Sequence, residues 1–286
     1  MDFETMKTKH ILTFLAGIIL CITAWGQAQV NVTITTKKDK LADFPMKTMK
    51  VVLTGNGFMD QPLREAVKNT WSISPFEFCT MDEFNSLKTS QDFYFMLVVR
   101  TQNRKEAEPG VSFIQILKGG HEDIGDMLEV VSMPLCPSAM TSGLEAAFMP
   151  AILDIMQVYI DTSLINGFKS IQSVMRKLSD IKGKTVVFAS DDISPKVSEQ
   201  FREKYFTGNV TVCDAEDAAE AMFSGRTDTV VGYSVAPAIP GKGSECWLML
   251  FDAYTHDLYY FKKYKTSDTA GFTRKDLSDI ISASRE

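Results

Sequence analysis

The chain has 286 residues, of which 45% are hydrophobic, so it can bury sizeable cores in one or two domains. Its formal net charge is −6, which argues against a general nucleic-acid binder because such proteins carry a basic face. We therefore expect a folded protein with no nucleic-acid partner.

The first 28 residues have the pattern of a secretory signal peptide. Two lysines precede an uncharged run at residues 11–25, and small residues occupy the −3 and −1 positions of a cleavage site after residue 28. A transmembrane helix needs about 20 apolar residues, which is more than this run offers. We expect Met6 to be the true start, the signal to be cleaved, and the mature protein to be periplasmic or secreted with no membrane span. The alternative is an uncleaved anchor or a lipoprotein modified at Cys21.

An internal repeat divides the rest of the chain. The hydrophobic pattern of residues 50–79 returns without a gap at residues 184–213, a spacing of 134 residues (184 − 50 and 213 − 79). Such self-similarity indicates tandem copies of one structural unit. We expect a loose leader at residues 29–45, a first repeat unit at residues 46–165 and a second at residues 166–286.

The first copy contains five predicted strands and one helix before its end. The strands lie at residues 49–53, 76–79, 93–99, 111–117 and 127–133. After a Gly-Asn-Gly turn at residues 55–57, Asp60 is predicted to cap a helix whose first turn contains Pro62, where a missing N–H costs little. The third strand is almost continuously apolar, which is typical of a strand buried on both faces.

The second copy repeats these steps. Its strands are predicted at residues 186–189, 210–213, 229–235, 246–251 and 258–264. Ser194 is the expected cap of its first helix, with Pro195 at the first helical position.

Three further helices complete the units. One apolar helical face spans residues 144–162, a second helix follows Gly167 with its stripe at residues 171–178, and Thr273 caps the last helix. We expect the first two of these helices to pack against one or both sheets. The predicted fold is therefore α+β (mixed α/β), with two tandem βαββββα units, each a mixed sheet with helices packed on it.

Four cysteines remain after the signal, without the spacing of a redox or zinc motif. They are Cys79, Cys136, Cys213 and Cys246. An oxidising compartment would permit disulfides, but their pairing cannot be read from the sequence. Cys79 and Cys213 hold equivalent repeat positions, and we interpret each as a small apolar residue at a strand end.

The turn between the last two strands of the second copy resembles one found in envelope proteins. Residues 252–257 read Asp-Ala-Tyr-Thr-His-Asp, and with the preceding order of strand, helix, strand and strand they resemble the N-terminal domain of TolB and the α/β domain of the curli transport lipoprotein. In those families the turn is Asp-Ala-x-Thr-Gly-like. Here His256 replaces the glycine, and the first copy departs further at residues 119–123. The resemblance covers about 80 residues per copy and implies a non-enzymatic role in assembly or binding at the Gram-negative envelope.

The sequence offers few catalytic or cofactor spacings. His121 and His256 both fall in turns and are interpreted as solvated, and no spacing fits a catalytic triad or a zinc site. Residues 55–57 stand where a dinucleotide loop would, but Asp60 replaces the third glycine and would repel phosphate. Residues 183–185 imitate the end of a P-loop but precede a strand instead of following it. We assign no catalytic residue, no metal and no cofactor.

Two features leave room for ligand binding. Asp191 and Asp192, with Glu216 and Asp217, could converge at strand ends for acid–base catalysis or calcium binding, although helix capping is the favoured interpretation. The last hairpin is rich in aromatic residues that could stack on a sugar if exposed, although core packing, with lysines guarding an edge strand, is favoured. The candidate ligand-binding residues are Asn56, Asp60, Ser190, Asp191, Asp192, Trp247 and Tyr259.

The leading hypothesis is an exported, non-catalytic binding or scaffolding protein of the bacterial cell envelope. Its partner would be a protein or another envelope component, and its oligomeric state is left open. The first alternative is a small-molecule or glycan binder that uses the cleft between the two lobes. The second alternative is a hydrolase that uses carboxylates near Asp191 and Asp192.

Overall fold

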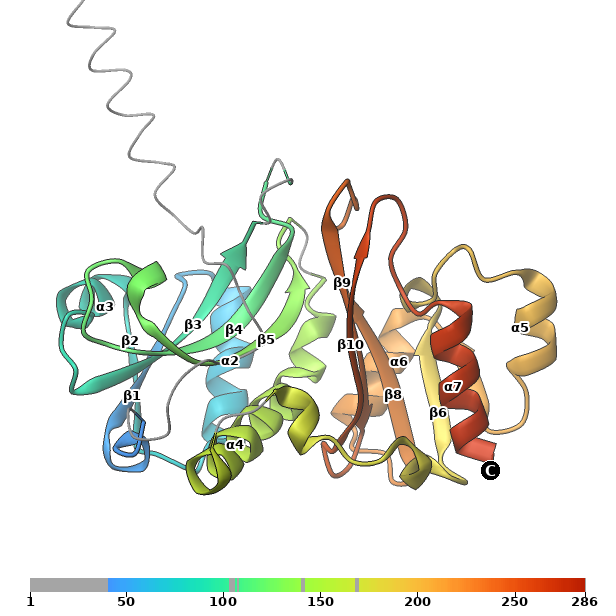
Figure 1. The fold of residues 1–286 in the computed structure, drawn as a ribbon, viewed down its shortest axis with the longest axis horizontal. Helices are drawn as coiled ribbons and strands as arrows, with labels where there is room; N and C mark the ends of the chain where they lie inside the picture. Colours follow the sequence, from blue (N-terminus) through green and yellow to red (C-terminus); the bar gives the residue numbers. More distant parts are fainter. Residues whose placement is uncertain (1–40, 103–105, 107, 140–141, 168–169, 286) are drawn as a thin grey trace, which may run out of the picture.

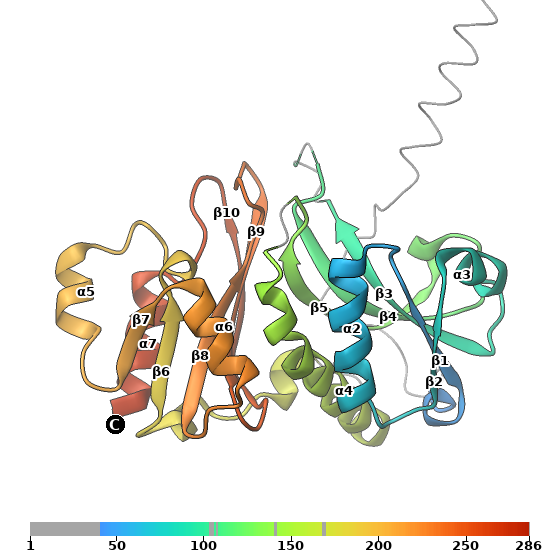
Figure 2. The same ribbon diagram turned by 180° about the vertical axis from the view of Figure 1, so that it is seen from behind.

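The computed structural model describes residues 41–102, 106, 108–139, 142–167 and 170–285 (Figure 1). The predicted signal peptide, Met6, Cys21 and most of the leader at residues 29–45 lie outside the described residues. Within the described residues, two similar units stand side by side, and the chain passes from the first to the second once (Figures 1 and 2).

Unit 1 is a five-stranded mixed sheet with three helices. Its elements are β1 (Thr48–Val52), α2 (Gly57–Thr70), β2 (Phe76–Cys79), α3 (Met81–Leu87), β3 (Phe93–Thr101), β4 (Val111–Lys118), β5 (Leu128–Pro137) and α4 (Met149–Asn166). The strand order is β2-β1-β3-β4-β5. β1 pairs in parallel with both β2 and β3, and the remaining pairs are antiparallel.

Unit 2 has the same topology. Its elements are β6 (Thr185–Ala189), α5 (Glu199–Tyr205), β7 (Val210–Cys213), α6 (Ala215–Phe223), β8 (Thr229–Val235), β9 (Ser244–Asp252), β10 (Leu258–Thr266) and α7 (Arg274–Arg285). The sheet order β7-β6-β8-β9-β10 matches that of unit 1 strand for strand. The mixed fold and the internal repeat are therefore confirmed.

Each unit contains one helix more than the sequence analysis predicted, between its second and third strands. In unit 1, Thr80 caps α3 by accepting a hydrogen bond from the Glu83 N–H, while the Glu83 carboxylate accepts one from the Thr80 N–H at 2.7 Å. In unit 2, Asp214 accepts from the Asp217 N–H at 2.8 Å and caps α6. The observed unit is βαβαβββα, because a capping box in unit 1 and an aspartate N-cap in unit 2 stabilise short helices that periodicity alone did not indicate.

The strand register shows that the repeat contains a gap. Cys79 pairs with Val52, whereas Cys213 pairs with Ala189. The second strands are thus 134 residues apart (213 − 79), but the first strands are 137 apart (189 − 52). Unit 2 is three residues shorter between its first and second strands. The gapless alignment therefore places the first strand of unit 2 three residues away from its true equivalent in unit 1. Because side chains alternate between the two faces of a sheet, a shift by an odd number assigns each residue of that strand to the wrong face.

Two helices begin at residues other than those predicted. Asn56 caps α2 by accepting from the Phe58 N–H at 3.1 Å, while Asp60 lies in the first turn and accepts from the Thr54 and Gly55 N–H groups. Ser198, not Ser194, caps α5. In both helices the predicted cap and the observed cap are four positions apart and both are good capping residues, so the backbone conformation of the turn determines which one caps the helix.

The predicted helix over residues 171–178 is two 3₁₀ turns, Ile171–Val174 and Leu178–Ile181. Between them, the Arg176 N–H donates to the Leu258 carbonyl at 2.9 Å, so this backbone group bonds to β10 instead of continuing a helix. The predicted last helix is confirmed, since α7 begins directly after Thr273, whose carbonyl accepts a hydrogen bond from the Leu277 N–H.

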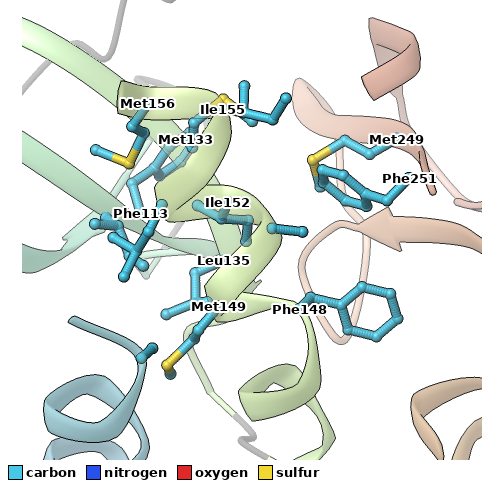
Figure 3. Close-up of a cluster of buried hydrophobic side chains, with 14 of the residues drawn as sticks. Phe113, Met133, Leu135, Phe148, Met149, Ile152, Ile155, Met156, Met249 and Phe251 are labelled. Atoms are coloured by element: carbon cyan, nitrogen blue, oxygen red, sulfur yellow. The ribbon is translucent and has the colours of Figure 1, made fainter. Parts of the chain in front are cut away.

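α4 lies between the two sheets and contributes to one core that both units share (Figure 3). Phe148 stacks on Tyr233 of β8 with ring centroids 3.9 Å apart, and Phe113 meets Trp247 edge to face at 5.6 Å. The Tyr233 hydroxyl donates to the Leu135 carbonyl at 2.5 Å. α4 is apolar around most of its circumference, as expected for a helix buried on more than one side.

The opposite face of sheet 2 carries a second core beneath α5 and α7. Alternate residues of β6 point to the two faces, so Val187 joins the shared core and Phe188 joins this one. Phe188 meets Phe272 at 5.0 Å, next to the start of α7. This packing places the first turn of α7 beside the end of β10 (Figure 1).

Candidate ligand-binding groove

The structure does not gather the sequence-predicted ligand residues into one site. Asn56 and Asp60 order the turn before α2 in unit 1, whereas Ser190, Asp191 and Asp192 form a turn after β6 in unit 2. Trp247 is 1% exposed in the shared core and Tyr259 is 6% exposed in the second core. Neither aromatic ring presents a surface to a ligand.

The aromatic hairpin serves packing. The Tyr260 hydroxyl donates to Asp276 at 2.7 Å, and the Tyr264 hydroxyl donates to the Gly271 carbonyl at 2.7 Å. β10 is an edge strand of its sheet, as predicted, and Lys263 pairs with Glu245 on the neighbouring strand. Core packing is therefore confirmed for most of the hairpin.

The interpretation of both histidines as solvated is wrong for His256. Its Nδ1 lies 2.6 Å from Oδ2 of Asp154 on α4, so this turn of unit 2 attaches to unit 1. His256 also has a φ of 61°, a left-handed conformation that favours glycine, the residue of the Asp-Ala-x-Thr-Gly-like turn. His121 is exposed, as expected.

The acidic residues of unit 2 serve separate local roles. Asp192 Oδ1 accepts from the Ser234 hydroxyl at 2.8 Å, and burial raises the pKa of Asp192 to about 7. Asp191 is exposed, and Glu216 and Asp217 lie in the first turn of α6, where acidic residues complement the helix dipole. Among the described residues, no group of three or more His, Cys, Asp or Glu side chains could hold a metal ion.

All four cysteines of the described residues are free thiols. Cys79 is buried at a strand end, and Cys213 is half-buried at the equivalent position. Burial raises the pKa of Cys79 to about 11 and that of Cys136 to about 12, so neither is an activated nucleophile.

An open groove of about 690 Å³ lies on unit 2, away from the shared core. It is walled by the loop before α5, the end of β10 with the loop that follows it, and the first turn of α7. The lining residues are Ser194, Lys196, Val197, Gly243, Tyr264, Lys265, Thr266, Ser267, Asp268, Thr269, Thr273, Arg274 and Lys275.

Short backbone contacts hold two walls of the groove together. Ile193 and Phe272 form an isolated parallel bridge. The Phe272 N–H donates to the Asp192 carbonyl at 2.7 Å, and the Ser194 N–H donates to the Phe272 carbonyl at 3.1 Å. Gly271, with a φ of 97°, passes so close that a Cβ there would lie 2.5 Å from the Asp192 carbonyl oxygen. The walls are therefore positioned by the fold itself.

The groove is locally basic in an acidic protein. Four cationic side chains, Lys196, Lys265, Arg274 and Lys275, line it against one acidic side chain, Asp268, which gives a local charge of +3 (4 − 1). The chain as a whole carries −6. This arrangement can attract and orient an anionic group.

The groove was not predicted from the sequence, because a lysine at position 265 equally suits the protection of an edge strand. The usable signal was local, since residues 265–275 combine cations and hydroxyl side chains between a strand and a helix. Lys196 joins this segment only through the tertiary fold.

The chain matches no protein-family model, no curated protein and no solved structure. Among the described helices, none has the length and apolar character needed to cross a membrane.

Proposed function

We propose that this chain is an exported, non-catalytic binding protein of the bacterial cell envelope, and that it binds its ligand in the groove of unit 2. The groove carries the proposal, because three separate segments of the fold bring polar and charged side chains together there. The signal-peptide pattern of residues 1–28 and the resemblance to envelope domains support the location.

The groove is a better candidate than a cleft between the lobes. Along α4 the two units meet through buried apolar side chains, including Phe148, Ile155 and Phe251 (Figure 3). A ligand in that position would have to replace packing that is part of the shared core.

The carboxylate-based hydrolase is a weaker proposal than binding. A glycosidase places two carboxyl groups on either side of the scissile bond. The groove is lined by the single carboxylate of Asp268, which Lys196 holds at 2.8 Å. Asp192 bonds to Ser234 beside the groove and does not belong to its lining.

Site-specific photo-crosslinking of the full-length protein in its native cells tests this proposal. A photoreactive residue in place of Ser267 lies in the groove, and the same residue in place of Asn69 lies on the exposed surface of α2 in unit 1. We expect a light-dependent adduct in the exported fraction from the Ser267 position and none from the Asn69 position. Equal adducts at both positions, or none in the groove, would contradict the proposal.

A further inference from the structure

One internal carboxylate already sits in the groove. Asp268 binds the Lys196 ammonium through both oxygens, at 2.8 and 3.0 Å, although the two residues are 72 positions apart in the chain. Both side chains remain accessible, at 57% and 64% exposure. The hydrogen bond from Lys196 is the largest cause that lowers the pKa of Asp268, so the group is ionised over the physiological range.

The other cations of the groove are available to a ligand. Within the described residues, neither Lys265 nor Lys275 has a carboxylate partner within ion-pair distance. Arg274 lies over the Phe201 ring, with its guanidinium carbon 5.7 Å from the ring centroid, and likewise has no carboxylate partner among the described residues. Three positive charges on two segments can therefore receive more than one negative group.

Hydroxyl side chains stand between these charges. Ser194, Thr266, Ser267, Thr269 and Thr273 all line the groove, with Ser194 only 3% exposed. The Thr266 hydroxyl donates to the Thr269 carbonyl and the Thr273 hydroxyl donates to Asp276, so these two can serve a ligand only as acceptors. Hydroxyl groups both donate and accept hydrogen bonds, which suits a ligand that is rich in hydroxyl groups itself. The half-buried Tyr264 adds apolar surface to the same walls.

We propose that the groove binds an oligosaccharide that bears carboxylate groups, and that Asp268 occupies Lys196 in place of a ligand carboxylate until the ligand displaces it. This inference rests on the proposed binding function of the groove. The exchange replaces one carboxylate by another on the same ammonium, so no charge is left unpaired at Lys196. The remaining ligand carboxylates pair with Lys265, Arg274 and Lys275.

The first test compares two oligosaccharides of equal length by calorimetric titration of the full-length protein at low salt. We expect hexagalacturonate, which carries a carboxylate on every sugar, to bind, and neutral maltohexaose to give no signal. Because these charges are exposed, added salt should weaken the binding of hexagalacturonate. Equal binding of both sugars would overturn the role of the carboxylates, and tighter binding of a short polyphosphate would overturn the choice of a sugar.

The second test separates displacement of Asp268 from a general effect of charge. Exposed ion pairs stabilise weakly, so Asp268→Asn should tighten the binding of hexagalacturonate by about 1.4- to 5-fold. The gain should vanish when Lys196 is also replaced by Met, because the ammonium for which the carboxylates compete is then absent. Asp279→Asn removes an exposed acidic group of α7 outside the groove lining, and it should leave the affinity unchanged.

Three outcomes of this second test would overturn the inference. Asp268→Asn could leave binding unchanged or weaken it, or it could retain its gain in the Lys196→Met background. If Ser267 forms an adduct in cells but hexagalacturonate does not bind, the ligand class is wrong and the proposed function stands. If Ser267 forms no adduct, the proposed function itself fails.

Discussion

The stability of the protein should decrease as pH rises from about 4 to about 7, and Asp192 is the cause. Its carboxyl group receives hydrogen bonds from Ser234, which favour the ionised form, but burial is the larger effect and raises its pKa from 3.8 to about 7. The neighbouring charge of Asp191 acts in the same direction as burial. The charge of Asp192 in turn contributes to the raised pKa values of Tyr233 and Cys246, for which burial is the larger cause.

The direction and size of the effect follow from proton linkage. In the unfolded chain the group titrates near pH 3.8, whereas in the folded protein it keeps its proton to about pH 7. The associated stability is fully present below about pH 4 and is lost as pH rises to about 7. A pKa that is higher by about three corresponds to about 4 kcal/mol. The Asp192 residue keeps some contact with solvent, which weakens the effect of burial, so we expect about 1–3 kcal/mol.

Asp192→Asn tests this expectation because the amide keeps an acceptor for Ser234 but cannot ionise. The free energy of unfolding is measured by urea denaturation of both proteins at several pH values. We expect the variant to gain about 1–3 kcal/mol relative to the natural protein between about pH 4 and pH 8. Asp191→Asn is the control for loss of one negative charge at the adjacent, exposed position. A difference between Asp192→Asn and the natural protein that does not vary with pH would refute the reasoning.

Three further substitutions test the packing and the turns. Phe148→Ala removes a ring stacked on Tyr233, so the free energy of unfolding should fall by about 3–5 kcal/mol in urea denaturation, and a loss below 1 kcal/mol would contradict the shared core. Gly271→Ala places a methyl group against the Asp192 carbonyl at a backbone position with a left-handed φ, so the free energy of unfolding should fall by about 1–3 kcal/mol. Thermal denaturation measures this loss, and an unchanged melting temperature would contradict it. Asp252→Ala leaves the Lys184 ammonium and two turn N–H groups without their acceptor. We expect the free energy of unfolding to fall by about 3 kcal/mol at neutral pH. A fall of the same size under acidic conditions would contradict the lowered pKa of Asp252.

The strands of both units were predictable because their apolar runs are short and bounded by turns. The predicted range 229–235 coincides with β8, and the second strands of both units match their predicted bounds. Helix starts were less predictable, since Asn56 and Asp60 are both good caps and only the backbone of the turn decides between them. A sequence pattern does not contain that geometry.

The missed helices and the missed groove have different physical reasons. α3 is only seven residues long, too short for a clear hydrophobic period, although the Thr80 and Glu83 pair was a readable capping box. The groove brings Lys196 next to a segment about 70 residues later in the chain, and local sequence patterns do not indicate contacts between such distant segments. Trp247 and Tyr259 could not be recognised as buried from the sequence, because composition does not reveal which aromatic rings enter the core.

The position of α4 decides whether the two repeats can be separated by a break in the chain. By chain order this helix ends the first repeat, but its side chains complete the core of the second repeat as well. A break after Asn166 would leave one fragment with an exposed apolar helix and the other with a sheet that only α6 still covers on that face. The two units share one topology, yet α4 joins their cores, so we expect the pair to unfold together as one cooperative module.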